Sequence, residues 1–260
     1  MSKNLNELWP DMQKKAKLAC KENELIKPFL QQYILAFNED QVAEALSHFV
    51  LDKIQLPASM QENFYKLFTK HLKQTDISRL LHDDIIAITK RDPACINPLE
   101  ALLFSKGLHA LISHRIAHKL AKTQYQTALY LNYLGCIHFG VDIHPKAKIA
   151  AGLFIDHGDS LVIGETCVID EDVSILQDVT LGGTGKERGD RHPKIKKGVL
   201  IGAGAKILGN IKIGKYTKIG ASSVVLEDVP AYSTAVGVPA RVISKHPDRI
   251  PSEDMDHHLD

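Results

Sequence analysis

Glycine is nearly missing from the first half of this 260-residue chain. Only three glycines precede residue 141, at positions 107, 135 and 140, and the other fourteen follow. Aromatic residues show the opposite distribution, because thirteen of the sixteen lie before residue 141. Helices avoid glycine and pack with bulky side chains, whereas a narrow fold with repeated tight turns needs glycine and has no room for rings. The two distributions therefore predict a helical first half and a turn-rich second half.

Cysteine and net charge are scarce as well. The four cysteines, Cys20, Cys95, Cys136 and Cys167, lie far apart and form no Cys-x-x-Cys pair. No hydrophobic secretory segment follows Met1. These absences predict a cytoplasmic protein whose thiols stay reduced and buried. The formal net charge of +1 gives no indication of the partner.

One uncharged stretch approaches the length of a membrane span. Residues 123–141 contain no Asp, Glu, Lys or Arg over 19 positions. The stretch carries Gln124, Asn132 and His138, however, and has two glycines near its end. Because polar side chains are unfavourable in lipid, the stretch predicts a buried helix that leads into a turn, and no membrane association.

Apolar residues in the first half return at helical spacing. The clearest series are Val42, Ala45, Leu46, Phe49 and Val50, and Leu99, Leu102, Leu103, Leu108, Leu111, Ile112 and Ile116. Pro57 separates two helical runs, and Pro93 and Pro98 bracket a short link. Asp76 and Ser78 are candidate N-caps. We expect about six or seven helices between residues 4 and 135, within a helical N-terminal oligomerisation domain over residues 1–140.

Three histidines in this half are candidates for a metal site. His109, His114 and His118 are spaced five and four residues apart. No carboxylate or cysteine stands at a matching spacing, as a metal site would need. We therefore assign the three histidines to a partly exposed helix face, and we expect no metal.

From Ile143 onward an aliphatic residue returns every six positions. The series is Ile143, Ile149 and Ile155, then Ile163, Ile169, Ile175 and Leu181, and finally Ile195, Ile201, Ile207, Ile213, Ile219 and Val225. This period fits neither a helix nor an alternating strand, and it is the signature of a parallel β-helix of hexapeptide repeats. Each hexad forms a short strand and a tight turn, with the aliphatic side chain inside the prism.

Solenoids of this class coil left-handed. The sequence therefore predicts an α+β chain in which the helical domain is followed by a left-handed parallel β-helix. We place this catalytic domain at residues 141–245 and a flexible C-terminal tail at residues 246–260.

Two interruptions break the repeat. Two extra residues lie between Ile155 and Ile163, next to His157. A longer insertion, residues 182–193, leaves the solenoid as an extruded loop and contains His192. Insertions have no packing purpose in a solenoid and usually form binding loops. Because both interruptions carry a histidine, we expect the functional site beside them.

Positive charge gathers in the second half. Residues 191–245 hold ten Lys and Arg against two acids, so this stretch carries +8 and the rest carries −7, which sum to +1. A basic solenoid suits an anionic ligand such as a nucleotide phosphate. Nucleic acid is not indicated, because only two aromatic residues lie in this stretch. ATP and NAD are not indicated either, because Glu187 stands where a P-loop needs Ser or Thr, and Ile207 stands where a dinucleotide motif needs glycine.

The residues around the interruptions form a set of motifs. They are Asp92-Pro93-Ala94, Val141-Asp142-Ile143-His144-Pro145, Ile155-Asp156-His157, Asp172-Val173-Ser174-Ile175-Leu176-Gln177, Thr180-Leu181-Gly182-Gly183-Thr184-Gly185, Gly189-Asp190-Arg191-His192-Pro193-Lys194-Ile195 and Gly237-Val238-Pro239-Ala240-Arg241. Together they resemble the serine acetyltransferase family of hexapeptide-repeat acyltransferases. The match runs from about residue 90 to 245 and is narrower than the repeat alone, which many acyltransferases share. The resemblance implies acetyl transfer from acetyl-CoA to the hydroxyl of L-serine in cysteine biosynthesis, giving O-acetyl-L-serine and CoA.

The resemblance assigns roles that suit this chemistry. A serine hydroxyl is a poor nucleophile at neutral pH and needs a base with a pKa near 7, and a carboxylate can orient that base. The substrate is a zwitterion, whose carboxylate needs Arg or His and whose ammonium group needs acids. The implied catalytic residues are His157 and Asp142, and the implied serine-binding residues are Asp92, Asp156, Arg191 and His192.

The pantetheine arm of CoA needs a path lined by small residues. Ala203 and Ala221 each follow a repeat aliphatic by two positions and lie one coil apart, so we expect them to stack in one column. Gly183 holds the same place after Leu181. The resemblance adds Thr184 beside this path, and Lys218 is a candidate phosphate contact. The thioester needs no metal, because backbone N–H groups can hold its oxyanion.

The resemblance also implies partners. Members of the class are trimers with active sites between neighbouring prisms, and in this family the helical half joins two trimers into a hexamer. L-cysteine is implied as a feedback inhibitor at the serine site. The family tail often ends in an isoleucine that enters O-acetylserine sulfhydrylase, whereas this chain ends in Asp260, which puts that complex in doubt.

Three other functions stay open on the sequence alone. A related hexapeptide acetyltransferase would use a different acceptor, such as a sugar. A γ-type carbonic anhydrase would need three zinc histidines on the same solenoid, for which His144, His157 and His192 are available. A non-catalytic scaffold would bind the sulfhydrylase without turnover.

Overall fold

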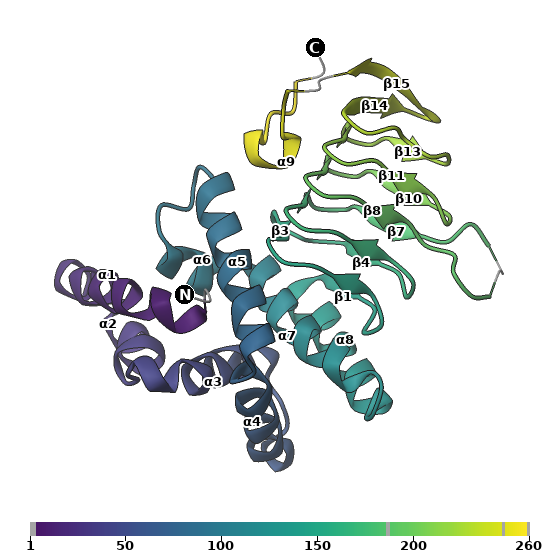
Figure 1. Cartoon of the computed structure of the whole chain (residues 1–260). Coiled ribbons are helices and arrows are strands. Elements are labelled where there is room, and N and C mark those ends of the chain that lie inside the picture. The colour runs from purple at the N-terminus through teal and green to yellow at the C-terminus, as the bar shows by residue number, and fades with distance from the viewer. Residues whose placement is uncertain (1–3, 186–187, 246–247, 259–260) are drawn as a thin grey trace.

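A computed structural model describes residues 4–185, 188–245 and 248–258, and it shows a helical half that leads into a triangular solenoid (Figure 1). The helical half comprises η1 Leu5–Leu8, α1 Trp9–Glu22, α2 Lys27–Leu30, η2 Gln31–Leu35, η3 Glu39–Gln41, α3 Val42–Ile54, α4 Ala58–Leu72, α5 Thr75–Arg91, α6 Pro98–Phe104, α7 Lys106–Leu120 and α8 Tyr125–Phe139. Gly140 ends α8 with a φ of 69°, and β1 begins at Val141. The predicted order of helices followed by a β-solenoid is confirmed.

The solenoid consists of short strands that pair in three parallel sheets. Sheet A contains β1 Val141–Ile143, β4 Leu161–Ile163, β7 Thr180–Gly182, β10 Lys206–Leu208 and β13 Val224–Val225. Sheet B contains β2 Lys148–Ile149, β5 Val168–Ile169, β8 Lys194–Ile195 and β11 Lys212–Ile213. Sheet C contains β3 Phe154–Ile155, β6 Ser174–Ile175, β9 Leu200–Ile201, β12 Lys218–Ile219, β14 Ser233–Gly237 and β15 Ala240–Lys245. Only β14 and β15 pair antiparallel among these strands, and they close the C-terminal end of the described solenoid.

The repeat aliphatics stack on one another inside the prism. In sheet C, for example, Ile155 pairs with Ile175, Ile175 with Ile201, and Ile201 with Ile219. All four side chains are buried. Because each coil places an aliphatic side chain on the previous one, burial of apolar surface propagates along the prism. The hexapeptide prediction is confirmed, and the left-handed coiling stays a prediction.

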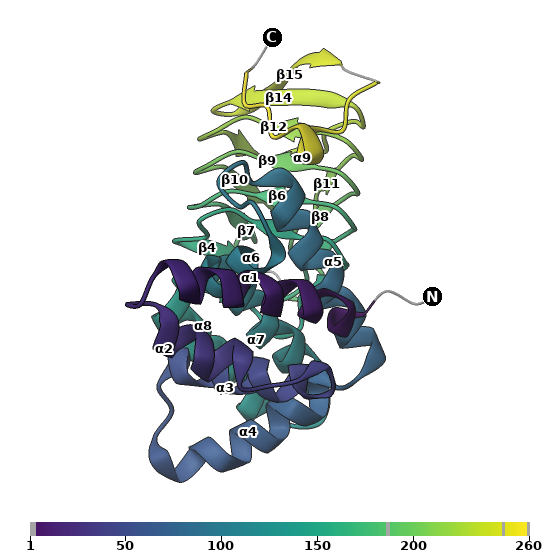
Figure 2. The ribbon, with the colours of Figure 1, turned by 90° about the vertical axis from the view of Figure 1, so that its left-hand side faces the viewer.

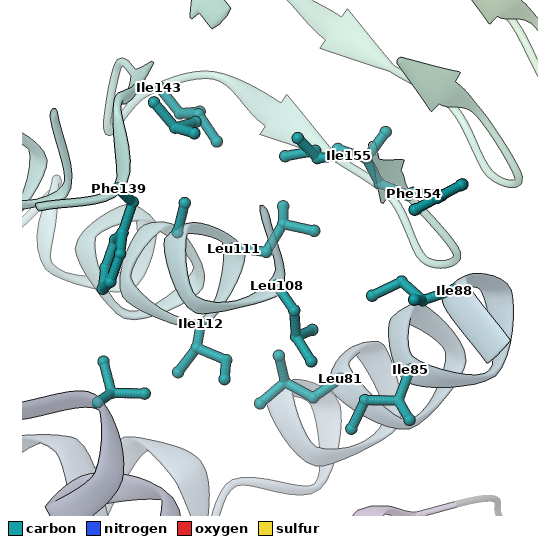
Figure 3. Close-up of a cluster of buried hydrophobic side chains, with 14 of the residues drawn as sticks. Leu81, Ile85, Ile88, Leu108, Leu111, Ile112, Phe139, Ile143, Phe154 and Ile155 are labelled. Carbon is teal, nitrogen blue, oxygen red and sulfur yellow. The ribbon is translucent and has the colours of Figure 1, made fainter. Parts of the chain in front are cut away.

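One hydrophobic core joins the helices to the first coil (Figure 3). Ile88 of α5 and Leu111 of α7 lie nearest to Phe154 and Ile155 of β3, and Leu108 of α7 points toward α5 (Figure 3). All five side chains are buried. The end of α5 and the start of α7 are therefore fixed against the coil that carries His157.

Gly107 allows α7 to approach β3 closely. A methyl group at Gly107 would lie 2.4 Å from the carbonyl oxygen of Ile155, which is a backbone atom that cannot move alone. We expect Gly107→Ala to lower the free energy of unfolding by about 1–3 kcal/mol, the usual effect of overpacking. Gly185→Ala is the matched control, because a methyl group there meets no atom within 4 Å. Equal thermal midpoints for the two variants would contradict this contact.

Several details of the helical half differ from the sequence predictions. Helix α5 begins at Thr75 after Gln74, so Asp76 lies in its first turn and Ser78 is buried there; neither is the N-cap. His109 and His114 are buried rather than partly exposed, because α7 lies between other helices and the solenoid.

Helix α8 is not buried on all sides. Its apolar side chains Leu129, Tyr133 and Ile137 are exposed, because only one face of the helix packs on α7 and β1. Cys136 on this helix is exposed as well, which differs from the expectation of buried thiols, although Cys95 and Cys167 are buried. Within the described residues, none of the helices is both long and apolar enough to cross a membrane.

The described part of the C-terminal tail packs against the protein, and its predicted flexibility stays a prediction. Helix α9, Pro251–Asp254, lies against α5 and across the face formed by β6, β9 and β12 (Figure 2). Pro251 and Ser252 are buried, and the Ser174 hydroxyl donates a hydrogen bond of 2.8 Å to the Ser252 carbonyl. Four residues are too few to show a periodic pattern, so the sequence did not indicate this helix. Asp260, on which the sulfhydrylase expectation rests, lies outside the described residues.

Candidate functional site

A cleft of about 480 Å³ opens between the helical half and the first coil of the solenoid. It is lined by the end of α5, by α6 and the start of α7, and by β3 with the turn that follows. Asp92, Asp156 and His157 all face this cleft, and we call them the Asp92 cluster. A larger cleft of about 800 Å³ between α5 and α9 contains none of the predicted site residues.

His157 stands at the corner after β3 and extends into solvent. Its side chain is 73% exposed, and its Nε2 lies 3.7 Å from Oδ1 of Asp156. Its φ of 57° is left-handed, but Asp172 and Ser222 adopt the same conformation at other corners. The conformation therefore belongs to the corner geometry of the solenoid, and it directs the imidazole outward.

The two acids of the cluster approach each other from different halves of the protein. Asp92 follows α5, and its Oδ1 accepts a hydrogen bond of 2.8 Å from the Ala94 amide. Asp156 follows β3, and its side chain is mostly buried. Burial raises its pKa, the nearby imidazole of His157 opposes this increase, and the negative charge of Asp92 adds to it. The negative charge of one carboxylate raises the pKa of the other, because two like charges lie near each other. A cation such as an ammonium group would relieve this repulsion, so the two acids form a suitable pocket for it.

A second group of polar residues lies where the extruded loop returns to β8. We call Arg191, His192, Glu165, His144 and Asp142 the Arg191 cluster. Nη2 of Arg191 donates to Oε2 of Glu165 at 2.8 Å, and Nζ of Lys146 lies 2.9 Å from Oε1 of the same carboxylate. The hydrogen bond from Lys146, and to a smaller extent the one from Arg191, lowers the pKa of Glu165 to about 2. Glu165 is therefore ionised at neutral pH and holds the guanidinium in place.

His192 is held in one orientation beside Arg191. Its Nδ1 lies 3.2 Å from the Thr166 amide and accepts this hydrogen bond, and the Thr166 hydroxyl lies 2.8 Å away. Burial lowers the pKa of His192, and the positive charge of Arg191 lowers it further. A neutral imidazole whose Nδ1 accepts carries its proton on Nε2, which leaves Nε2 as a donor for an anion. Gly164 makes room for this ring, since a methyl group there would lie 2.1 Å from Cδ2 of His192.

The two clusters lie at different edges of the prism. His157 follows sheet C, whereas Glu165 and the loop follow sheet A. Asp142 belongs to the second group: its Oδ1 accepts from Nδ2 of Asn132 at 3.1 Å, and its charge influences the pKa of His144. In the described residues, the structure records no contact between Asp142 and His157 within one chain. Within the described chain, the two residues of the predicted catalytic pair are therefore not joined.

The small residues predicted for CoA divide between the same two edges. Ala203 and Ala221 stack one coil apart, because the Ser222 amide donates to the Ala203 carbonyl at 2.8 Å. Both lie two positions after a sheet C aliphatic, in the column that begins with His157. Gly183 follows β7 of sheet A, so it is not in that column, and Thr184 beside it packs near Gly209.

Lys218 lies away from both edges. It is buried in β12, and its ammonium group donates to the carbonyl of His258 in the tail. Contact with a phosphate group of CoA would require the tail to move. In the described residues, no three His, Cys, Asp or Glu side chains are grouped as a metal ion would need.

Glu165 is a candidate site residue that the motifs did not indicate. It follows the sheet A aliphatic Ile163 by two positions, as Gly183 follows Leu181 and Glu227 follows Val225. An acid at this corner is therefore not a signal by itself, and it is the ion pair with Arg191 that distinguishes Glu165.

The ion pairs of Glu165 predict a pH dependence. Its pKa in the folded chain is about 2, below the ordinary value of 4.5, so its contribution to stability is complete above about pH 4.5 and is lost as the pH falls toward 2. We expect Glu165→Gln to lower the free energy of unfolding by up to about 1 kcal/mol at pH 7 and by less at pH 3. Glu227→Gln, at the equivalent corner after Val225, is the control. A stability gap for Glu165→Gln that stays constant from pH 7 to pH 3 would be inconsistent with the ion pairs.

Comparisons with known proteins place this chain in one family. A family described as serine acetyltransferase, N-terminal, matches residues 8–113, and the bacterial transferase hexapeptide repeat matches residues 192–227. A serine acetyltransferase of Haemophilus influenzae is 44% identical over 258 residues, which cover 97% of this chain and 95% of that protein. The chain belongs to the serine acetyltransferase family. It is an acyltransferase.

Solved structures of the family agree over nearly the whole chain. A serine acetyltransferase in complex with cysteine has a TM-score of 0.93 and 44% identity, covering 97% of this chain and 98% of its own. A serine acetyltransferase of Brucella abortus in complex with coenzyme A has a TM-score of 0.88 and 42% identity, with coverage of 92% and 96%. The likeness therefore includes both the helical half and the solenoid.

Proposed function

We propose that this protein transfers the acetyl group of acetyl-CoA to the hydroxyl of L-serine, as a cytoplasmic enzyme of cysteine biosynthesis. The observation that carries the proposal is the pair of clusters with complementary groups, two carboxylates in one and a guanidinium beside an imidazole N–H in the other. Asp92 and Asp156 suit the ammonium group of an amino acid, and Arg191 with the Nε2 donor of His192 suits its carboxylate. A zwitterionic acceptor has one charged group for each cluster, whereas a neutral sugar has none.

His157 acts as the general base in this proposal. Its imidazole takes the proton of the serine hydroxyl while the serine oxygen forms a bond with the thioester carbon. The carbon–sulfur bond then breaks, and the imidazolium returns the proton to the leaving sulfur of CoA. Asp142 fixes the tautomer of the base and stabilises the imidazolium. The step requires no metal, because a thioester carbonyl is already reactive and oriented N–H donors can stabilise its oxyanion.

The active site is shared between two subunits of a homotrimer, and two trimers join through their helical halves into a hexamer. The support for sharing is that one chain holds His157 and Asp142 at different places on the prism with no contact between them in the described residues. When two prisms pack side by side, the sheet C edge of one meets the sheet A side of the next. The Asp92 cluster of one subunit then faces the Arg191 cluster of its neighbour.

CoA follows the column of Ala203 and Ala221 toward His157. These methyl-sized side chains leave space for the narrow pantetheine arm along the edge on which the base stands. Gly183 and Thr184 line the opposite wall from the neighbouring subunit. Lys218 would contact a phosphate group of CoA only after the tail that covers it has moved.

L-cysteine is the expected feedback inhibitor. It carries the same ammonium and carboxylate groups as L-serine, so both clusters would bind it, and its thiol would take the place of the hydroxyl beside His157. A related enzyme was solved with cysteine, which supports this expectation. Binding of O-acetylserine sulfhydrylase stays a prediction that the described residues do not address.

A comparison of three acceptors tests the proposal. Release of CoA from acetyl-CoA is measured with L-serine, L-homoserine and a galactoside as acceptors, with and without L-cysteine. We expect turnover with L-serine that exceeds the other two by at least about tenfold, together with inhibition by cysteine. Turnover with the galactoside and none with serine would show a different acyltransferase.

A further inference from the structure

We propose that Arg91 is a positioning residue whose guanidinium fixes the Asp92 carboxylate opposite Asp156 and thereby sets the affinity for the acceptor's ammonium group. This inference rests on the serine acetylation proposed above and adds to it a residue that lies outside the site. Arg91 is the last residue of α5, directly before Asp92.

The Arg91 side chain attaches the end of α5 to the solenoid. It is only 7% exposed. Its Nη1 donates to the carbonyl of Gly152 at 2.9 Å, to the carbonyl of Val173 at 3.3 Å and to the hydroxyl of Ser174 at 3.4 Å. Its Nη2 donates to Oδ1 of Asp172 at 3.1 Å. All four acceptors belong to the first two coils, so one guanidinium spans both.

Asp92 has little freedom relative to α5. Its amide donates to the carbonyl of Ile88 at 2.9 Å, and its carbonyl accepts from the Cys95 amide at 3.1 Å. Its carboxylate accepts from the Ala94 amide. Because these contacts fix the carboxylate to the end of α5, its place in the cleft depends on where that end sits against the solenoid.

The same two coils hold the other carboxylate. The Asp156 amide donates to the carbonyl of Ile175 at 2.9 Å, and the Phe154 amide donates to the carbonyl of Val173 at 2.9 Å. Arg91 binds this segment at Val173 and Ser174. Arg91 is therefore the anchor that adjoins Asp92 and also binds the segment that holds Asp156, and a small shift of reacting groups in a site costs up to about 100-fold.

A separate ion pair keeps the two halves of the protein together when Arg91 is changed. Arg115 of α7 donates to both oxygens of Asp84 in α5, at 2.8 and 2.9 Å, and Asp84 also accepts from the amides of Gly152 and Leu153. Asp172 retains Lys197 as a partner at 3.2 Å. Loss of the Arg91 guanidinium thus leaves the neighbouring charges compensated, which separates its effect on the cleft from its effect on folding.

Steady-state kinetics of Arg91→Met in the full-length protein test the inference. We expect the KM for serine to rise by about 10–100-fold, while kcat at saturating serine and the KM for acetyl-CoA change by less than about threefold. The inhibition constant for cysteine should rise in parallel. Arg91→Lys keeps the charge but loses the two guanidinium nitrogens that bind different acceptors, so its serine KM should lie between those of wild type and Arg91→Met. The control is Lys90→Met, which removes a charge from an exposed residue at the same helix end and should leave all parameters unchanged.

The outcomes separate this inference from the proposed function. If wild type is active and a folded Arg91→Met has an unchanged serine KM, the inference alone is refuted. It is also refuted if both KM values rise and kcat falls by the same factor, because such a uniform change indicates a purely structural role. Wild type that releases no CoA with serine refutes the proposed function and the inference with it. If Arg91→Met does not fold, Arg91→Lys and Asp172→Asn decide: a raised serine KM supports the inference, and wild-type values overturn it.

Discussion

Replacing His157 with asparagine lowers kcat by about 10²–10⁴-fold, the usual effect of removing a general base. Asparagine tolerates left-handed backbone better than most residues, so it can adopt the φ of 57° without distorting the corner. The KM values for serine and acetyl-CoA should change little, because the ammonium and carboxylate of serine bind elsewhere. The measurement is steady-state CoA release together with a thermal midpoint that matches wild type.

His138→Asn is the matched control for this variant. It makes the same chemical change on α8, outside both clusters, and should keep full activity. Full activity of His157→Asn would show that another group acts as the base and would refute this assignment.

The second large effect concerns folding. Asp84→Ala should lower the free energy of unfolding by about 3–5 kcal/mol, because it leaves the buried Arg115 guanidinium without its carboxylate. Two backbone amides, of Gly152 and Leu153, lose their acceptor as well. The measurement is denaturant unfolding at pH 7, and the expected change is a lower midpoint with an unchanged slope.

Two further variants serve as controls for this result. Asp84→Ala combined with Arg115→Met removes both charges and should recover part of the loss. Asp76→Ala breaks the exposed pair with Lys119 and should have a much smaller effect. A single Asp84→Ala variant that stays within about 1 kcal/mol of wild type would show that the pair does not hold the halves together.

The repeat made most of the solenoid predictable. A buried aliphatic every six residues leaves one arrangement for the strands, and the stacking of Ala203 on Ala221 follows from their separation of 18 residues. Gly183 holds the same place after its repeat aliphatic as Ala203 and Ala221 do, but it lies in another column. Three hexads make a coil, and counting them assigns Leu181 to sheet A and Ile201 to sheet C.

Other features depend on contacts between distant segments. No local pattern distinguishes a lysine on the solenoid surface from Lys218, which the tail covers. His114 carries no signal of burial in its own helix, since burial comes from β1 and α8 on either side. The site itself was predicted as a set of residues but not as two clusters. Motifs identify which side chains take part, whereas the edge on which each stands depends on the fold.

Mixing two inactive variants tests the shared active site most directly. His157→Asn lacks the base, and Arg191→Met lacks the carboxylate-binding guanidinium; each alone should be nearly inactive at modest serine concentration. When the two are refolded together in equal amounts, about a quarter of the sites between neighbours combine an intact His157 with an intact Arg191. The mixture should therefore recover about a quarter of wild-type serine acetylation. Activity no greater than the sum of the separate variants would contradict a site built from two subunits.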